Sequence, residues 1–467
     1  MAQEQQQRFI QLGTMPVNKL VLKMSAPTMV AMLATAIYNM ADTYFVSNLG
    51  KSQSGAVGIV FPLMSIIQAM GMTFGAGGAS YISRLLGEKN LKEANRTVST
   101  SFFTSICAAV VFAVVCSLFV TPMMRAFGAT ETILPYAVEY ARWILLGTPF
   151  IAATFVLNQS LRAEGNAMLG MIGIMAGGLL NVVLDPIFIY TLDLGVAGAA
   201  IATVISQCVG CLILLTHYVR KRTSLRLSIR EFTFSAGIYK EIFKIGIPTF
   251  LRQSLGSIYT IFLNNAASPY GDSVIAGMNL ATRISFVVFS LLLGFCQGYQ
   301  PVAGYNFGAQ NHHRLREAFW FSMKVVLLVM VVCAAIVIIF APQLIGVFLN
   351  EPDVVEVGAR LLRLVGIFYP LMGLATVVNF TYQALGRGIA STVLSTCRQG
   401  WAALPILFIM TRFNALDMIL WATPLADLVF GVTGIILGVK TAKEIKAWCE
   451  RRSEDSQEGA LLEHDAE

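Results

Sequence analysis

The sequence predicts an all-α polytopic membrane protein with twelve transmembrane helices in two six-helix lobes related by a parallel repeat. Three observations predict this fold: a low content of charge, a series of long apolar stretches, and a repeat at a fixed offset. Of the 467 residues, 56% are hydrophobic and 13% are charged, whereas soluble proteins carry about 25% charged residues. The shortage of charge extends over nearly the whole chain, so we expect no soluble domain beside the membrane part.

The long apolar stretches define the individual spans. A helix needs about 20 mainly apolar residues to cross the hydrocarbon core, and lipid offers the backbone no hydrogen-bond partners, so spanning segments are helices or closed barrels. The stretches are continuously apolar, unlike the alternating strands of a membrane barrel. Helices are therefore expected at about 19–47, 53–80, 95–120, 133–160, 167–191, 196–219, 238–267, 273–303, 316–341, 355–384, 388–411 and 416–441.

The charged loops predict the orientation of the chain. Lys and Arg gather in alternate connections, namely 84–96, 220–230 and 314–316, and in the segment 443–452 after the last span. Because positive loops stay on the cytoplasmic side, both termini are expected in the cytoplasm and the protein in the cytoplasmic (inner) membrane. The same loops account for the net charge of +7, so we expect membrane lipids and no nucleic acid as partners.

The second half of the chain repeats the first at an offset of 221 residues. Lys19 falls on Lys240 and Pro27 on Pro248 without a gap. Six spans separate the copies, an even number, so both copies have the same orientation, as in transporters with a central site between two halves. The predicted organisation is an N-terminal cytoplasmic segment (1–16), an N-lobe (17–220), a cytoplasmic linker (221–237), a C-lobe (238–445) and a polar tail expected to be disordered (446–467).

Four motifs carry a resemblance to a known family. They are NMADTYFV in the first span, NVVLDPIFIY in the fifth, FLRQSLGS in the seventh and GYQPVAGYNFGAQN at the end of the eighth. With the repeat, they make residues 15–445 similar to multidrug and toxic compound extrusion (MATE) transporters. The carboxylates concentrate in the N-lobe, which resembles the DinF-type branch. The resemblance implies an antiporter that uses H⁺ or Na⁺ to export lipophilic, often cationic, drugs and toxic organic compounds.

Buried carboxylates mark the candidate coupling site. An ionisable residue inside a span is costly and is by default a functional candidate. By the predicted topology, Asp42, Asp185, Thr203 and Tyr140 lie in the outer half of the N-lobe at depths that agree within roughly 5 Å. Asn181 shares a helix face with Asp185 because four residues separate them. Oxygen ligands of this kind suit a proton or a hard cation such as Na⁺ and not a soft metal; we expect no other cofactor.

The resemblance implies the same site and adds two residues. It includes Asn158, which by the predicted topology lies nearer the inner end of the fourth span. It also implies that Pro27 is a conformational hinge, and a proline does remove a helix hydrogen bond and permits a bend. The alternatives are a fixed kink at Pro27, and a structural role for Asp42 and Asp185 as caps or as partners of an interior arginine.

Several polar residues fall within the C-lobe spans. Arg252, Gln253, Arg283 and Arg398 are candidates for a C-lobe cavity or gate, either as structural pairs between helices or as substrate contacts. Asp427 fits no cluster of carboxylates, so we expect it to pair with another buried group.

Three other functions are alternatives to export by antiport. An enzyme would need histidine clusters or similar groups within the spans, and all four histidines lie at span ends, in loops or in the tail, so we expect no enzyme. A channel would need a selectivity filter, which no segment resembles. A flippase or exporter of a lipid-linked or metabolite substrate on the same fold stays open because of the C-lobe arginines. The expected partners are amphipathic small molecules, the coupling cation and lipids, and we expect a monomer.

Overall fold

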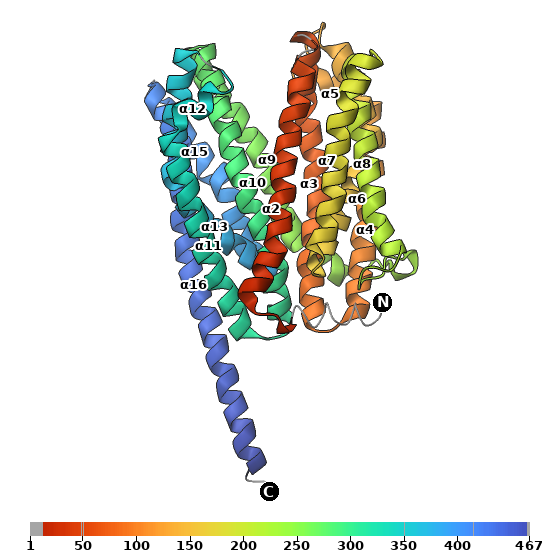
Figure 1. The fold of residues 1–467 in the computed structure, drawn as a ribbon, viewed down its shortest axis with the longest axis vertical. Coiled ribbons are helices and arrows are strands. Elements are labelled where there is room, and N and C mark those ends of the chain that lie inside the picture. Colours follow the sequence, from red (N-terminus) through yellow and green to blue (C-terminus); the bar gives the residue numbers. More distant parts are fainter. Residues whose placement is uncertain (1–12, 48, 50, 350, 414, 465–467) are drawn as a thin grey trace.

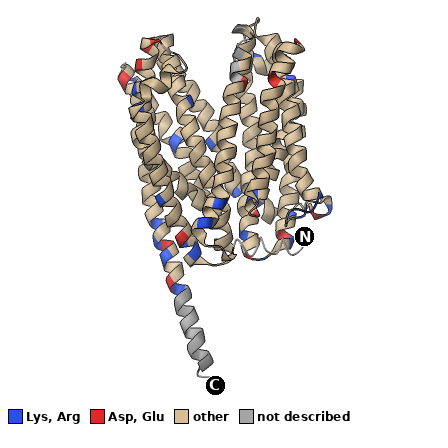
Figure 2. Ribbon diagram, in the orientation of Figure 1, with Lys and Arg blue, Asp and Glu red and all other residues tan. Residues whose placement is uncertain are grey.

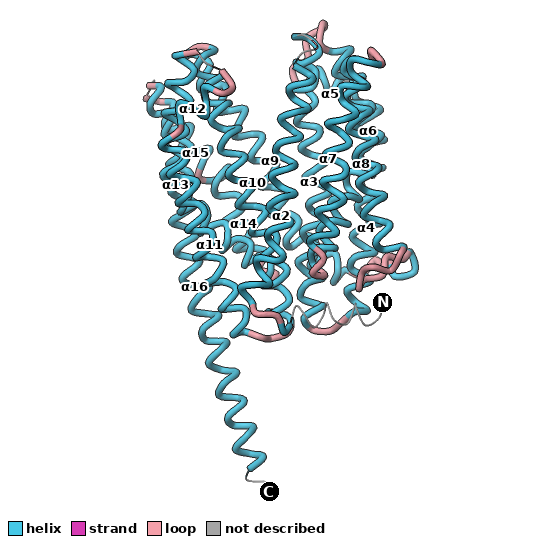
Figure 3. The backbone as a smooth tube through the Cα atoms, in the orientation of Figure 1, coloured by secondary structure: helices cyan, strands magenta, loops and turns pink. Residues whose placement is uncertain are grey.

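The computed structural model describes residues 13–47, 49, 51–349, 351–413 and 415–464, and every regular element in these ranges is a helix (Figure 3). The predicted segment 1–16 falls largely outside them. The N-lobe contains α2 (Val17–Ser47), α3 (Lys51–Gly87), α4 (Leu91–Leu118), the short α5 (Val120–Ala126), α6 (Leu134–Ala163), α7 (Ala167–Pro186), the π-helix η1 (Ile187–Thr191) and α8 (Gly195–Val219).

The C-lobe repeats this order. After the 3₁₀ turn η2 (Ile229–Glu231) it contains α9 (Ala236–Ala267), η3 (Ser268–Tyr270), α10 (Asp272–Gly308), α11 (His312–Ile339), the short α12 (Ala341–Gly346), α13 (Pro352–Ala384), and one span built from α14 (Gly388–Thr396), the π-helix η4 (Cys397–Trp401) and α15 (Ala403–Thr411), followed by α16 (Leu416–His464). Figure 1 shows the two lobes as separate bundles that lie side by side.

Each of the twelve predicted spans coincides with one of these long helical segments. Within the described ranges, eleven are long and apolar enough to cross a membrane. The twelfth, α9, has 32 residues but is interrupted by polar side chains such as Arg252 and Asn264. It packs against α3 and α14 within the bundle, so its polar residues have protein neighbours as well as lipid.

The repeat extends to the turns that end the helices. Asn90 caps α4 by accepting a hydrogen bond from the Glu93 N–H at 3.1 Å, and Asn311 caps α11 by accepting from the Arg314 N–H at 3.3 Å. Such caps satisfy backbone donors that a helix start leaves unpaired. The residues before these caps, Lys89 and Gln310, both have a positive φ. Since each pair is 221 residues apart, the same type of turn and asparagine cap starts the equivalent helix in both lobes.

The lobes meet at the end of the bundle where α2 begins and where α16 leaves it, and their helices diverge towards the opposite end (Figure 1). Here α2 packs against α10, and α3 against α9 and α10. Glycines permit the contact: a Cβ on Gly298 would lie 2.4 Å from the Ser25 Cα, and one on Gly77 would lie 2.1 Å from the Ile242 carbonyl oxygen. Figure 2 shows Lys and Arg concentrated towards this end.

The predicted tail begins within the last helix of the structure. The segment 446–464 continues α16 as a helix, which projects from the bundle (Figure 1). Low hydrophobicity suggested disorder, but Glu, Lys, Arg and Ala are also strong helix formers. Lys446 and Glu450 add an ion pair of 3.5 Å at the favourable i,i+4 spacing, so an existing transmembrane helix can extend through this charged sequence.

Candidate functional site

A cluster of polar side chains lies between α7 and α8 in the N-lobe. The Asn181 amide nitrogen donates a hydrogen bond of 3.1 Å to Asp185 Oδ1 and lies 3.4 Å from Thr203 Oγ1 on α8. Asp185 has no exposed surface and Asn181 has 4%. The helix is irregular directly after the aspartate, because Pro186 provides no N–H and η1 follows as a π-helix. Such interruptions of α-helices are frequent at functional sites.

The second carboxylate of the site comes from α2. The side chains of Asp42 and Asp185 are close enough to interact directly across the contact between α2 and α7. Asp42 Oδ1 and Asp185 Oδ2 are both buried, and neither has a hydrogen-bond donor among the residues that the structure describes. Two ionised carboxylates can only accept hydrogen bonds. A proton or a cation between them would satisfy both orphaned oxygens.

The available ligands therefore fit a coupling ion of the expected kind. Asp42, Asp185 and the Thr203 hydroxyl supply hard oxygen atoms, which suit a proton or Na⁺. Within the described ranges, no three His, Cys, Asp or Glu side chains are grouped so as to hold a metal. The residues proposed to hold Na⁺, which are Asp42, Asn181, Asp185 and Thr203, thus come together from three helices.

Tyr140 belongs to the surroundings of this cluster. It is fully buried on α6, lies close enough to both aspartates for their charges to act on it, and its hydroxyl is 3.9 Å from the Met64 sulfur. Tyr38, which was not predicted as a site residue, is also close to Asp42 and packs against α7, where Gly178 has no side chain. The available signal was its spacing of one helical turn from Asp42.

Asn158 is not part of the cluster. Its amide nitrogen donates a 2.8 Å hydrogen bond to the Gly170 carbonyl oxygen on α7. Gly170 precedes Asp185 by fifteen residues, or about 22 Å along a helix. The repeat-related residue, Asn379, also joins two helices, because it bonds to Ser391 and Ser395 of α14. In both lobes this asparagine therefore ties the fourth span to the fifth, and the structure does not support the coupling role that the resemblance implied for Asn158.

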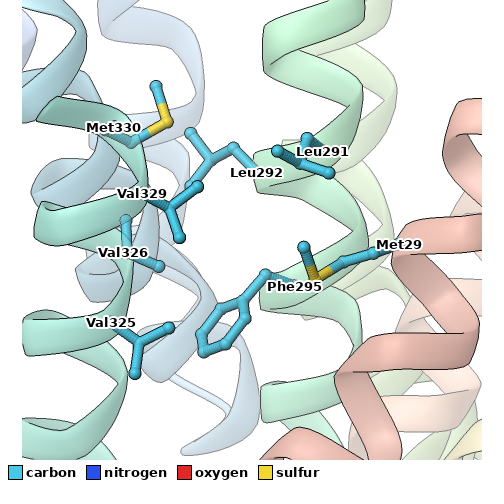
Figure 4. A pocket seen from close by; sticks show the side chains of 8 residues that line it. All are labelled: Met29, Leu291, Leu292, Phe295, Val325, Val326, Val329 and Met330. Atoms are coloured by element: carbon cyan, nitrogen blue, oxygen red, sulfur yellow. The ribbon is translucent and has the colours of Figure 1, made fainter. Parts of the chain in front are cut away.

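The C-lobe holds α2 close to Pro27. Thr28 donates a 2.5 Å hydrogen bond to the Gly294 carbonyl oxygen, and a Cβ on Gly294 would lie 2.5 Å from the Met29 Cα. Beside this contact, Met29 faces an apolar crevice between α2, α10 and α11 (Figure 4). The helix that carries Asp42 is thus attached to the other lobe next to its proline. The crevice is lined by Met29, Leu291, Leu292, Phe295, Val325, Val326, Val329 and Met330.

The C-lobe arginines are not equivalent. Arg398 Nε lies 2.5 Å from Asp427 Oδ1, which confirms the expected pairing of Asp427, and its guanidinium lies 4.9 Å from the centre of the Phe289 ring. Arg252 and Arg398 line one small cavity. Arg283 is exposed on α10, and Gln253 is half-buried next to Arg252; neither lines the cavity.

These features define a class of protein. Two parallel six-helix bundles, a buried pair of carboxylates in one and a polar cavity in the other are the architecture of a secondary transporter of the membrane. The sequence profile of the MatE family matches residues 27–187 and 248–409, and these matches begin 221 residues apart. The chain belongs to this family, the MATE transporters, and is a multi-pass membrane protein.

Individual relatives match over nearly the whole chain. Multidrug export protein MepA of Staphylococcus haemolyticus is 29% identical over 412 residues, which cover 88% of this chain and 91% of that protein. The structure of a MATE in the straight conformation is 29% identical, has a TM-score of 0.88, and is matched over 94% of this chain and 99% of that one. A MATE in the bent conformation is also 29% identical, with a TM-score of 0.87 and coverage of 94% and 98%.

Proposed function

We propose that the protein is an antiporter of the cytoplasmic membrane that uses H⁺ or Na⁺ to export lipophilic, often cationic, drugs and toxic organic compounds. The observation that carries the proposal is the contact between Asp42 and Asp185, whose orphaned oxygens lie between α2 and α7. The similarity to a multidrug export protein supports the class of substrate. The positive loops support cytoplasmic termini, in which case the lobes meet on the cytoplasmic side and the structure faces outward.

Helix α2 connects the proposed cation site to the contact with the C-lobe, and so can couple cation binding to a conformational change. Two ionised carboxylates repel each other. Whether Asp42 and Asp185 are both ionised, or share a proton or a cation, therefore determines how closely α2 can approach α7. The inner half of α2 is fixed to the C-lobe at Thr28, so α2 transmits a change at Asp42 to the segment around this attachment. Pro27 lies beside Thr28 and lacks an N–H, and we propose it as the hinge. A cation can shift the conformation only if its affinity differs between the two states.

The distribution of carboxylates supports the DinF-type branch. The N-lobe pair has no cationic partner among the described residues, whereas Asp427 of the C-lobe is paired with Arg398. The coupling charge therefore belongs to the N-lobe. We propose a monomer as the functional unit, and this is supported by a site whose residues all come from one chain.

The test is transport of ethidium, a lipophilic cation, by purified protein in proteoliposomes, with pH and Na⁺ gradients imposed separately. One of the two gradients should drive uptake into vesicles that contain inverted protein. Asp42→Asn should abolish this uptake, and the matched control Asp193→Asn, an exposed aspartate after η1, should not. Uptake by Asp42→Asn at the wild-type rate would show that the pair is not the coupling site.

One observation favours the alternative, a flippase or exporter of a lipid-linked or metabolite substrate. Arg252 has no acidic partner among the described residues, although it lines a cavity. A lipid-linked carrier would be expected to move a fluorescent polyprenyl pyrophosphate between leaflets, which the same proteoliposomes can measure. Movement of that lipid without ethidium transport would select the alternative.

A further inference from the structure

The C-lobe cavity contains more positive than negative charge. It is lined by Arg252 from α9, Phe289 from α10, and Arg398 and Gln399 from the π-helix η4. The only acidic group with an ion pair there, within the described ranges, is Asp427, which binds Arg398 through Nε. Two guanidinium groups therefore face one carboxylate. Burying an uncompensated cation is costly, so the cavity would gain stability from an added anion.

Arg252 is the group with free hydrogen-bonding capacity. The described residues provide it with no acceptor and no ion pair, and it lies close enough to Arg398 for the two positive charges to interact. One turn further along α9, Gly256 leaves room for Gln399, whose oxygen would lie 2.9 Å from a Cβ at this position. The side-chain amide of Gln399 and the guanidinium group of Arg252 thus lie on the same side of α9.

The shape of the site suits a small polar head group with an apolar body. The cavity has a volume of about 30 Å³, enough for one or two waters or for a carboxylate. The lining also contains apolar side chains such as Phe289, Leu293 and Phe430, together with the neutral polar side chains of Thr376, Asn379 and Ser395. A guanidinium binds a carboxylate through two parallel hydrogen bonds.

This charge cluster is specific to the C-lobe. In the register of the repeat, Arg252, Arg398 and Asp427 correspond to Ala31, Gly177 and Ser206, none of which can ionise. In the N-lobe, a Cβ on Gly177 would lie 3.0 Å from the Ser206 carbonyl oxygen, so the helices pack directly. In the C-lobe the equivalent segment is the π-helix η4, and π-helical turns are often found at functional sites.

We propose that this cavity binds the carboxylate of an amphipathic organic anion or zwitterion, with Arg252 as the main charge partner and Arg398 as the second. The inference rests on the proposed export function, since it defines the head group of a compound that the transporter carries. It adds a site with the opposite polarity to the carboxylate pair of the N-lobe.

The test is equilibrium binding to the full-length protein in lipid nanodiscs, by isothermal titration calorimetry without any ion gradient. The probes are naphthaleneacetate, its neutral carboxamide and naphthylmethyl-trimethylammonium, which differ mainly in the head group. Wild-type protein should bind the carboxylate about tenfold more tightly than the carboxamide, the effect of one strong charge-assisted hydrogen bond. Equal affinities for the three probes, or tightest binding of the cation, would overturn the proposal.

Substitutions then test which arginine binds the carboxylate. Arg252→Gln should weaken carboxylate binding about tenfold and leave carboxamide binding nearly unchanged, while Arg252→Lys should have an intermediate effect because it keeps the charge and loses the fork. Asp427→Asn should strengthen carboxylate binding, because it releases Arg398. Arg412→Gln removes an exposed arginine next to Phe408 and is the control. Carboxylate binding that is insensitive to Arg252→Gln would place the anion elsewhere.

The site and the proposed function can fail separately. Gradient-driven ethidium transport without a preference for the carboxylate would refute the C-lobe site and leave the antiporter intact. Binding of the carboxylate that depends on Arg252, without gradient-driven transport, would support the site and refute the antiporter.

Discussion

Arg84 and Glu241 form an ion pair between the two lobes, with Arg84 Nη2 2.7 Å from Glu241 Oε2. Both side chains are largely buried, at 12% and 20% exposure. Arg84 comes from the end of α3 and also lies 5.2 Å from the centre of the Tyr81 ring. A Cβ on Gly386 would lie 2.5 Å from its guanidinium. The pair is therefore enclosed where the lobes meet, and opening this end of the protein must break it.

Glu241→Gln should destabilise the observed conformation. A charge-assisted hydrogen bond of this kind contributes about 1.5–3 kcal/mol, so its loss should shift the equilibrium about tenfold towards the state in which the lobes separate here. Spin labels at the exposed residues Thr132 and Asp353, on the opposite end of the two lobes, should report shorter distances by pulsed electron paramagnetic resonance. Lys244→Gln is the control, because Lys244 pairs with Glu241 within α9 at 3.2 Å. Unchanged distances in Glu241→Gln would show that the pair does not hold the lobes.

The two aspartates should act as one unit. Asp42→Asn and Asp185→Asn should each leave the protein folded and unable to exchange substrate for cation. Since residues that act together are strongly non-additive, the double variant should be scarcely worse than either single one. Ethidium binding without a gradient should survive in all three, as measured by fluorescence polarisation. Independent, multiplicative losses of transport would mean that the carboxylates act at separate sites.

Asn158 and Asn181 should differ in what they affect. Asn158→Ala removes the buried hydrogen bond from α6 to the Gly170 carbonyl oxygen of α7, which contributes about 0.5–1.5 kcal/mol, so the melting temperature in detergent should fall while coupling persists. Asn181→Ala should instead impair transport, because it removes the donor to Asp185. Asn379→Ala is the repeat-related comparison and should resemble Asn158→Ala. Loss of coupling without loss of stability in Asn158→Ala would restore its predicted place in the site.

Gly298→Ala should disturb the contact between α2 and α10. The added Cβ would lie 2.4 Å from the Ser25 Cα, and overpacking of this type costs about 1–3 kcal/mol. We expect the same shift in the spin-label distances as for Glu241→Gln. Gly58→Ala is the control, because nothing lies within 4 Å of its added Cβ. A wild-type distance distribution in Gly298→Ala would mean that the lobes tolerate a wider separation at this point.

The fold could be predicted from short segments of the sequence. The long apolar stretches predicted the helices, and matches such as Lys19 with Lys240 predicted the repeat, because both signals can be read from short segments of the chain. The last helix continues into the charged segment 446–464 because charge opposes burial without opposing helix formation. For the proposed coupling site, the predicted depths of Asp42, Asn181, Asp185 and Thr203 in the membrane were similar, and in the structure these side chains form one cluster.

The sequence by itself determined the number of spans, their parallel repeat and the presence of costly charges within them, since each depends on how a short segment interacts with lipid or water. Only the tertiary structure decided which of these charges meet. Asp42 faces Asp185, Arg398 neutralises Asp427, and Arg84 pairs with Glu241, which is 157 residues away in the chain. Arg252 has no acidic partner among the residues that the structure describes. The physical reason is that the rotation of each helix about its axis, and its neighbours, are set by side-chain packing between helices. No single segment encodes that packing.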